Sequence, residues 1–150
     1  IGCSGWWDYY LNGKKIEEYY NYFDNWIPKM ANQEDNITFI NSVKKRCESE
    51  YKYLEETIIK YQNLDTIKKI IIVTHTIPEL HFDKDEDPVV SCNSKFSNLV
   101  KKYNKISYWI FGHTHNKIEK NVDNIKYICN PRGRPEDNNL DGYCIRSITI

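Results

Sequence analysis

The stretch YWIFGHTHNK, residues 108–117, decides the fold, because an apolar run ends there in a pair of histidines, His113 and His115. A second apolar run, KKIIIVTH (68–75), also ends in a histidine, His75. Continuous apolar runs bounded by polar residues are typical of strands that are covered on both faces. The sequence therefore predicts two buried strands, over 68–75 and 106–111, with histidines at their carboxyl ends.

Hydrophobic periodicity predicts the other elements. Apolar residues step by three or four between residues 37 and 61, which indicates a long amphipathic helix with Asp35 as a candidate cap. The remaining expected elements are a helix over 15–27, a short helix capped by Ser94, a hairpin over 117–130 with its turn at Asp123 and Asn124, and a final strand over 143–150. This order predicts an α/β chain in which helices cover at least one face of the sheet.

Composition excludes some classes of function. The 21 basic residues balance the 21 acidic ones, which argues against a broad basic surface for nucleic acid. No apolar stretch approaches the ~20 residues that a membrane span needs, so we expect no membrane partner. The five cysteines are scattered and contain no CxxC pair, which favours reduced cysteines in an intracellular, cytoplasmic protein.

The histidines are the clearest candidates for chemistry. Three of the four histidines follow buried strands, at the sheet edge where α/β proteins place their ligands. If residues 113–115 continue extended, His113 and His115 point to the same side and can face one metal centre. Neutral imidazole binds Zn²⁺, Fe and Mn²⁺. His75 is the third candidate ligand. His81 lies in an acidic loop, and we expect it only to form hydrogen bonds with carbonyl groups of that loop.

Four segments together resemble the calcineurin-like metallophosphoesterases. The pair VTHTIP (73–78) and FGHTH (111–115) is similar to the C-terminal signatures of that family. GCSGWWDYY (2–10) resembles the GxxGWYDYS stretch of small bacterial and viral members, and YICNPRGRPED (127–137) resembles their ICNPxGYP stretch. The resemblance covers nearly the whole chain, and the two histidine motifs together are more specific than either alone.

The resemblance implies a four-layer α/β/β/α sandwich, in which two mixed sheets are flanked by helices, with a dinuclear metal centre at the sheet edge. By the resemblance, His75 and His113 ligate one metal and His115 ligates the other. The ligand types fit two divalent ions of Mn, Fe or Zn. The implied activity is hydrolysis of phosphate mono- or diesters, and a phosphate ester is then the expected substrate.

Three earlier motifs of the family, DxH, GDxxD and GNH, are absent from these 150 residues. We therefore expect residues 1–150 to be one domain, the C-terminal portion of such an enzyme, with the carboxylate ligands coming from outside this chain. The opening IGCSG (1–5) has the pattern of a strand that ends in a loop. An exposed sheet edge would then favour self-association or an N-terminal companion segment.

Other residues and functions stay open at this stage. Arg132 could bind a phosphate in bidentate fashion, and Trp7 could line the substrate site, although turn formation and aromatic packing explain these residues equally well. Cys3 and Ser4 lie in a Gly-flanked loop, but no base is placed beside them in sequence. The alternatives to an enzyme are a non-catalytic protein-binding scaffold of the same fold, an inactive fragment, and a single-metal binder in which three imidazoles hold one ion.

Overall fold

The computed structural model describes residues 1–9, 36–79, 81–82, 91–134 and 143–149. Its elements are α2 (Asn36–Gln62), β1 (Ile70–Val73), α4 (Phe96–Lys102), β2 (Ile106–Phe111), β3 (Ile118–Val122) and β4 (Ile125–Cys129). The helix predicted over 15–27, the Asp35 cap and the acidic stretch 83–87 lie outside the described residues.

The strands form one mixed sheet in the order β1-β2-β4-β3. Strands β1, β2 and β4 are parallel, and β3 runs antiparallel to β4. The carboxyl ends of β1, β2 and β4 therefore meet at one edge of the sheet. The α/β class is confirmed for the described residues, which form one mixed four-stranded sheet with two helices, and the four-layer sandwich stays a prediction.

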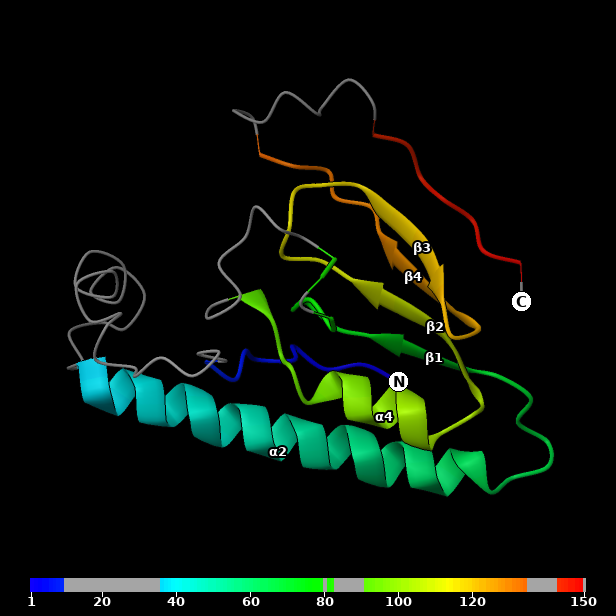
Figure 1. Cartoon of the computed structure of the whole chain (residues 1–150), viewed down its shortest axis with the longest axis horizontal. Helices are drawn as coiled ribbons and strands as arrows, with labels where there is room; N and C mark the ends of the chain where they lie inside the picture. Colours follow the sequence, from blue (N-terminus) through cyan, green and yellow to red (C-terminus); the bar gives the residue numbers. More distant parts are fainter. Residues whose placement is uncertain (10–35, 80, 83–90, 135–142, 150) are drawn as a thin grey trace.

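Both described helices pack on the same side of this sheet (Figure 1). Helix α2 buries Leu54 and Ile58 completely, which confirms the amphipathic helix expected over 37–61. Opposite them, Ile72 of β1 and Trp109 of β2 are 0% exposed and pair across the two strands. The indole N–H of Trp109 donates to Thr74 Oγ1 at 2.9 Å, so the one polar atom of this side chain is also satisfied.

The hairpin is confirmed, and its turn follows from local backbone preferences. Asp123 and Asn124 have φ values of 49° and 66°. Two successive positive φ values are those of a type I′ turn, whose twist matches a two-residue hairpin. Asn and Asp tolerate this conformation better than other non-glycine residues. The turn sets the register in which Val122 pairs with Ile125.

The opening residues continue the sheet beyond β1. Cys3 N–H donates to Val73 O at 3.1 Å, and Val73 N–H donates to Ile1 O at 2.9 Å. These bonds make a parallel bridge at Gly2, as expected for the end of a strand. All five cysteines are free, as predicted. No helix among the described residues is long and apolar enough to cross a membrane.

Two local predictions are wrong. Helix α4 begins at Phe96 with Lys95 at its N-cap position and no side-chain cap. Ser94 instead donates its hydroxyl to Asp8 Oδ2 at 2.5 Å, so a tertiary acceptor has replaced the local capping bond.

The strand predicted over 143–150 is the second error, because residues 143–149 form no strand. They run beyond β3, away from both helices (Figure 1). Their contacts to the sheet use side chains: Arg146 pairs with Glu119, and Tyr108 Oη donates to Thr149 O at 3.4 Å. An alternating apolar pattern gives a strand only where a backbone ladder partner is available.

Candidate metal centre

The carboxyl edge of the sheet brings two of the predicted histidines together. His75 follows β1 and His113 follows β2, and His75 Nε2 lies 3.3 Å from His113 Nδ1. The two rings meet edge to face with their centroids 5.2 Å apart. The loops are also joined through the backbone, because Gly112 N–H donates to His75 O at 3.0 Å.

A sharp turn at His113 sets the direction of its ring. His113 has a φ of 69°, and Thr114 N–H donates to Gly112 O at 2.9 Å. A hydrogen bond across three residues with a positive central φ defines a γ-turn, which is rare and strained. The expectation that residues 113–115 continue extended is therefore wrong. Strained backbone of this kind clusters at functional sites.

Gly112 leaves the space that the His75 ring occupies. A Cβ on Gly112 would lie 3.2 Å from His75 Nδ1 and 3.6 Å from His75 O. A side chain here would press on the ring and on the backbone bond between the two loops. The glycine before the first histidine of FGHTH thus allows the close approach of the β1 and β2 loops.

The two nitrogens are spaced as ligands of one ion would be. Two imidazole nitrogens at ~2.05 Å from a tetrahedral Zn²⁺ are roughly 3.3 Å apart, which is the separation between His75 Nε2 and His113 Nδ1. His75 is an exposed residue, and partial desolvation of its ring lowers its pKa. His75 is therefore neutral near pH 7, the form that offers a lone pair to a metal. In this structure the two nitrogens form a hydrogen bond with each other, and the tautomer decides which ring donates. Binding of one ion by both rings stays a prediction.

His115 does not join this pair as a third ligand. Within the residues that the structure describes, no group of three or more His, Cys, Asp or Glu side chains could hold a metal ion. The structure therefore places His75 and His113 together, with half-buried His115 two positions further along, after the γ-turn. The ring of His81 packs against Phe82 at 4.5 Å.

The two candidate substrate residues lie in different settings. Trp7 is 5% exposed, and its ring lies 6.4 Å from the ring of His113. It is therefore a buried neighbour of His113. Arg132 is exposed and follows β4, so it lies beyond the carboxyl end of a strand parallel to β1 and β2. Substrate binding by either residue stays a prediction.

Residues 4–6 hold the backbone of His75, and the histidine motifs gave no signal for this contact. Ser4 O accepts hydrogen bonds from His75 N–H at 2.9 Å and from Thr76 N–H at 3.4 Å. Thr76 Oγ1 donates to Gly5 O. Residues 4–6, which we call the support loop, thus fix the backbone of the first histidine. Burial raises the pKa of the neighbouring Cys3 thiol to about 12, so the thiol is protonated and no nucleophile at neutral pH.

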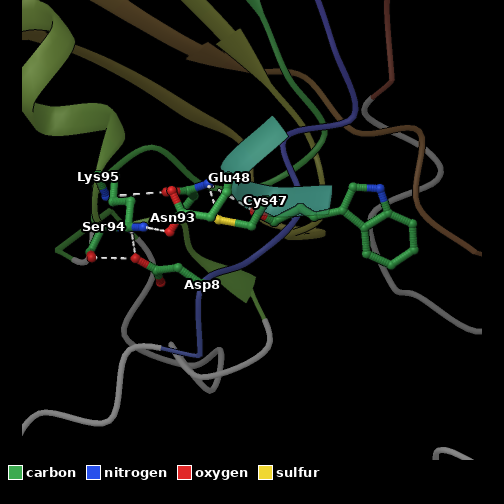
Figure 2. Close-up of polar contacts among 7 residues, drawn as sticks. Asp8, Cys47, Glu48, Asn93, Ser94 and Lys95 are labelled. Carbon is green, nitrogen blue, oxygen red and sulfur yellow. Dashed lines mark hydrogen bonds and ion pairs between the residues drawn. The ribbon is translucent and has the colours of Figure 1, made fainter. Parts of the chain in front are cut away.

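A polar cluster connects residues 6–8 to α2 and to the turn before α4 (Figure 2). Asn93, which is fully buried, donates from Nδ2 to Trp6 O at 2.8 Å and to Cys47 Sγ at 3.2 Å. Asp8 Oδ2 accepts from the backbone N–H of Ser94 at 3.1 Å as well as from its hydroxyl. The cluster connects residues 6–8, α2 and the turn before α4, so the site rests on elements distant in sequence.

No protein-family model matches the chain, and no curated protein matches it. Among solved structures, the chain is similar to the crystal structure of phosphopantetheinyl hydrolase (PptH) from Mycobacterium tuberculosis. The TM-score is 0.57 at 16% sequence identity, over 87% of this chain and 48% of that chain. The chain thus spans about half the length of this relative. PptH has a metallophosphoesterase fold, and the α/β fold described here matches part of that structure.

Proposed function

We propose that this chain contributes the histidine half of a dinuclear metal centre that hydrolyses phosphate mono- or diesters. The observation that carries the proposal is the pair His75 and His113, whose facing nitrogens are 3.3 Å apart at the carboxyl edge of the sheet. The partial similarity in fold to PptH, which is a hydrolase, supports the same class of reaction.

The proposed roles follow from position. His75 and His113 would hold one ion, and His115 would bind the second. The candidate ions are Mn²⁺, Fe and Zn²⁺, because imidazole suits all three. The bridging carboxylate and the other ligands would come from outside these 150 residues, which contain no DxH, GDxxD or GNH motif.

When bound, two such ions supply a water of lowered pKa and neutralise charge on the phosphoryl oxygens. The chain's own residues prepare the site. His75 presents a neutral imidazole, and the γ-turn at His113 aims the second ring at it. Buried Trp7 lies beside His113, with the two ring centroids 6.4 Å apart. Arg132, exposed beyond β4, would bind a non-bridging oxygen of the substrate.

The test is Mn²⁺-dependent hydrolysis of bis(4-nitrophenyl) phosphate by the 150-residue chain. We expect a low rate, because no third His, Cys, Asp or Glu joins the pair among the described residues. The rate should be abolished by a chelator and by His113→Ala. His81→Ala is the matched control and should leave the rate unchanged, since His81 packs on Phe82.

Two outcomes would count against the proposal. A rate that is equal in wild type and His113→Ala would assign the hydrolysis to a contaminant or to free metal. Bound metal without any turnover, together with tight binding of a protein partner, would support the non-catalytic scaffold instead.

A further inference from the structure

We propose that Glu50 is a positioning residue for His75. Glu50 lies on α2 and holds the support loop, residues 4–6, and this loop in turn fixes the backbone of His75. The inference rests on the proposed function in one respect, because it takes His75 to be a metal ligand.

The carboxylate of Glu50 binds two successive backbone N–H groups of the support loop. Its Oε2 accepts from Gly5 N–H at 2.5 Å and from Trp6 N–H at 3.2 Å. Gly5 has a φ of 66°, and a left-handed residue among consecutive N–H groups forms a concavity that binds anions. Hydrogen bonds to a carboxylate are about twice as strong as those between neutral groups. Glu50 therefore holds the backbone of Gly5 and Trp6 firmly in place.

Glu50 is directed at the loop by its place on α2. Val43, Cys47, Glu50 and Leu54 follow one another at steps of four, three and four residues, and the three apolar members are buried. Residues at this spacing share one face of a helix. Glu50 is thus a charged, half-buried residue within the stripe that faces the core, and the two N–H groups of the loop are what satisfies it.

The opposite side of the loop holds the metal-ligand candidate. Ser4 O accepts the backbone N–H groups of His75 and Thr76, and Gly5 O accepts the Thr76 hydroxyl. The loop is tightly packed, since a Cβ on Gly5 would lie 3.0 Å from atoms of Thr74, Thr76 and Phe96. A displacement of the loop is therefore transmitted to His75.

Loss of Glu50 should displace the loop without unfolding the protein. Trp6 is held from both sides, its N–H by Glu50 and its carbonyl by buried Asn93. The Asn93 bond remains when Glu50 is removed. The expected effect is a less well-placed His75 ring in a folded chain.

The experiment compares Co²⁺ affinity with stability for wild type and four variants of the 150-residue chain. Glu50→Ala should weaken Co²⁺ binding about tenfold, the lower end of what loss of an outer-shell partner costs. Glu50→Gln keeps an acceptor oxygen and should restore most of the affinity. Glu56→Ala, on the exposed side of α2, should change nothing. Val43→Ala removes a buried methyl pair and should lower the urea midpoint without weakening Co²⁺ binding.

A second readout needs no metal. The imidazole ¹⁵N and ¹H signals of His75 should move in metal-free Glu50→Ala, while those of His81 should not. Unchanged affinity and unchanged His75 signals in Glu50→Ala would overturn the inference. An equal loss of affinity in Val43→Ala would also overturn it, because the effect would then follow stability. If wild type binds no Co²⁺, the proposed function fails, and the His75 signals still decide whether Glu50 positions this ring.

Discussion

The histidine loops follow apolar runs in the sequence, and the C-terminal segment, residues 143–149, has an apolar pattern of its own. Of these two regions, the histidine loops are held by hydrogen bonds between backbone groups. His75 N–H donates to Ser4 O, and His75 O accepts from Gly112. The C-terminal segment meets the sheet through side chains such as Arg146, which pairs with Glu119. Backbone partners on both sides, rather than an apolar pattern alone, therefore give a segment a defined place in this fold.

The two faces of the sheet also differ in how closely they are packed. The face toward the helices is closed, with Trp109 fully buried, whereas Val73 is 45% exposed on the other face. A groove of about 320 Å³ separates the C-terminal segment from Tyr108, Ile110 and Ile128 of that open face. The segment therefore covers the open face loosely, and its Ile145 is 88% exposed.

The largest effect is expected in the support loop of the histidine site. Gly5→Ala should lower the free energy of unfolding by about 3 kcal/mol, measured by urea denaturation. A positive φ costs a non-glycine residue roughly 1–3 kcal/mol, and the three contacts at 3.0 Å add the cost of overpacking. Gly133→Ala is the control, because Gly133 also has a positive φ, of 81°, but lies beyond β4.

From the positive φ alone, Gly133→Ala should cost roughly 1 kcal/mol. A loss in Gly5→Ala no greater than this would mean that close packing does not hold the support loop. The contrast between the two regions would then lose its physical basis.

The smallest effect is expected in the C-terminal segment. Ile145→Ser should change the free energy of unfolding by less than about 0.5 kcal/mol, since an exposed side chain without packing contributes little. The same urea denaturation measures it. A loss comparable to that of Gly5→Ala would show that Ile145 is packed in solution and that the segment is as well fixed as the histidine loops.

Much of the fold could be predicted because its signals are local. The runs that became β1 and β2, and the stripe of α2 that includes Leu54 and Ile58, carry their own periodicity. The meeting of His75 and His113 was also predictable, because parallel strands end at one edge. Ser94 as a helix cap was not, because its hydroxyl bonds Asp8, a residue far away in the sequence.

The finer geometry of the site depends on contacts that the histidine motifs do not carry. The γ-turn at His113 directly follows Gly112, whose N–H donates to His75 O in the β1 loop. An extended backbone over residues 113–115 was therefore the wrong expectation. The sequence contains one signal for the role of Glu50, which is a charged residue within the apolar stripe of α2. That signal becomes informative only when the support loop is known to lie against it.

The most direct test of the central claim is to count the imidazole ligands of a bound ion. Zinc K-edge X-ray absorption of the 150-residue chain with one equivalent of Zn²⁺ reports this number. Two imidazoles per ion are expected in wild type and fewer in His113→Ala. Zinc bound with the same imidazole count in both proteins, or no bound zinc in wild type, would contradict the assignment of His75 and His113 as one ligand pair.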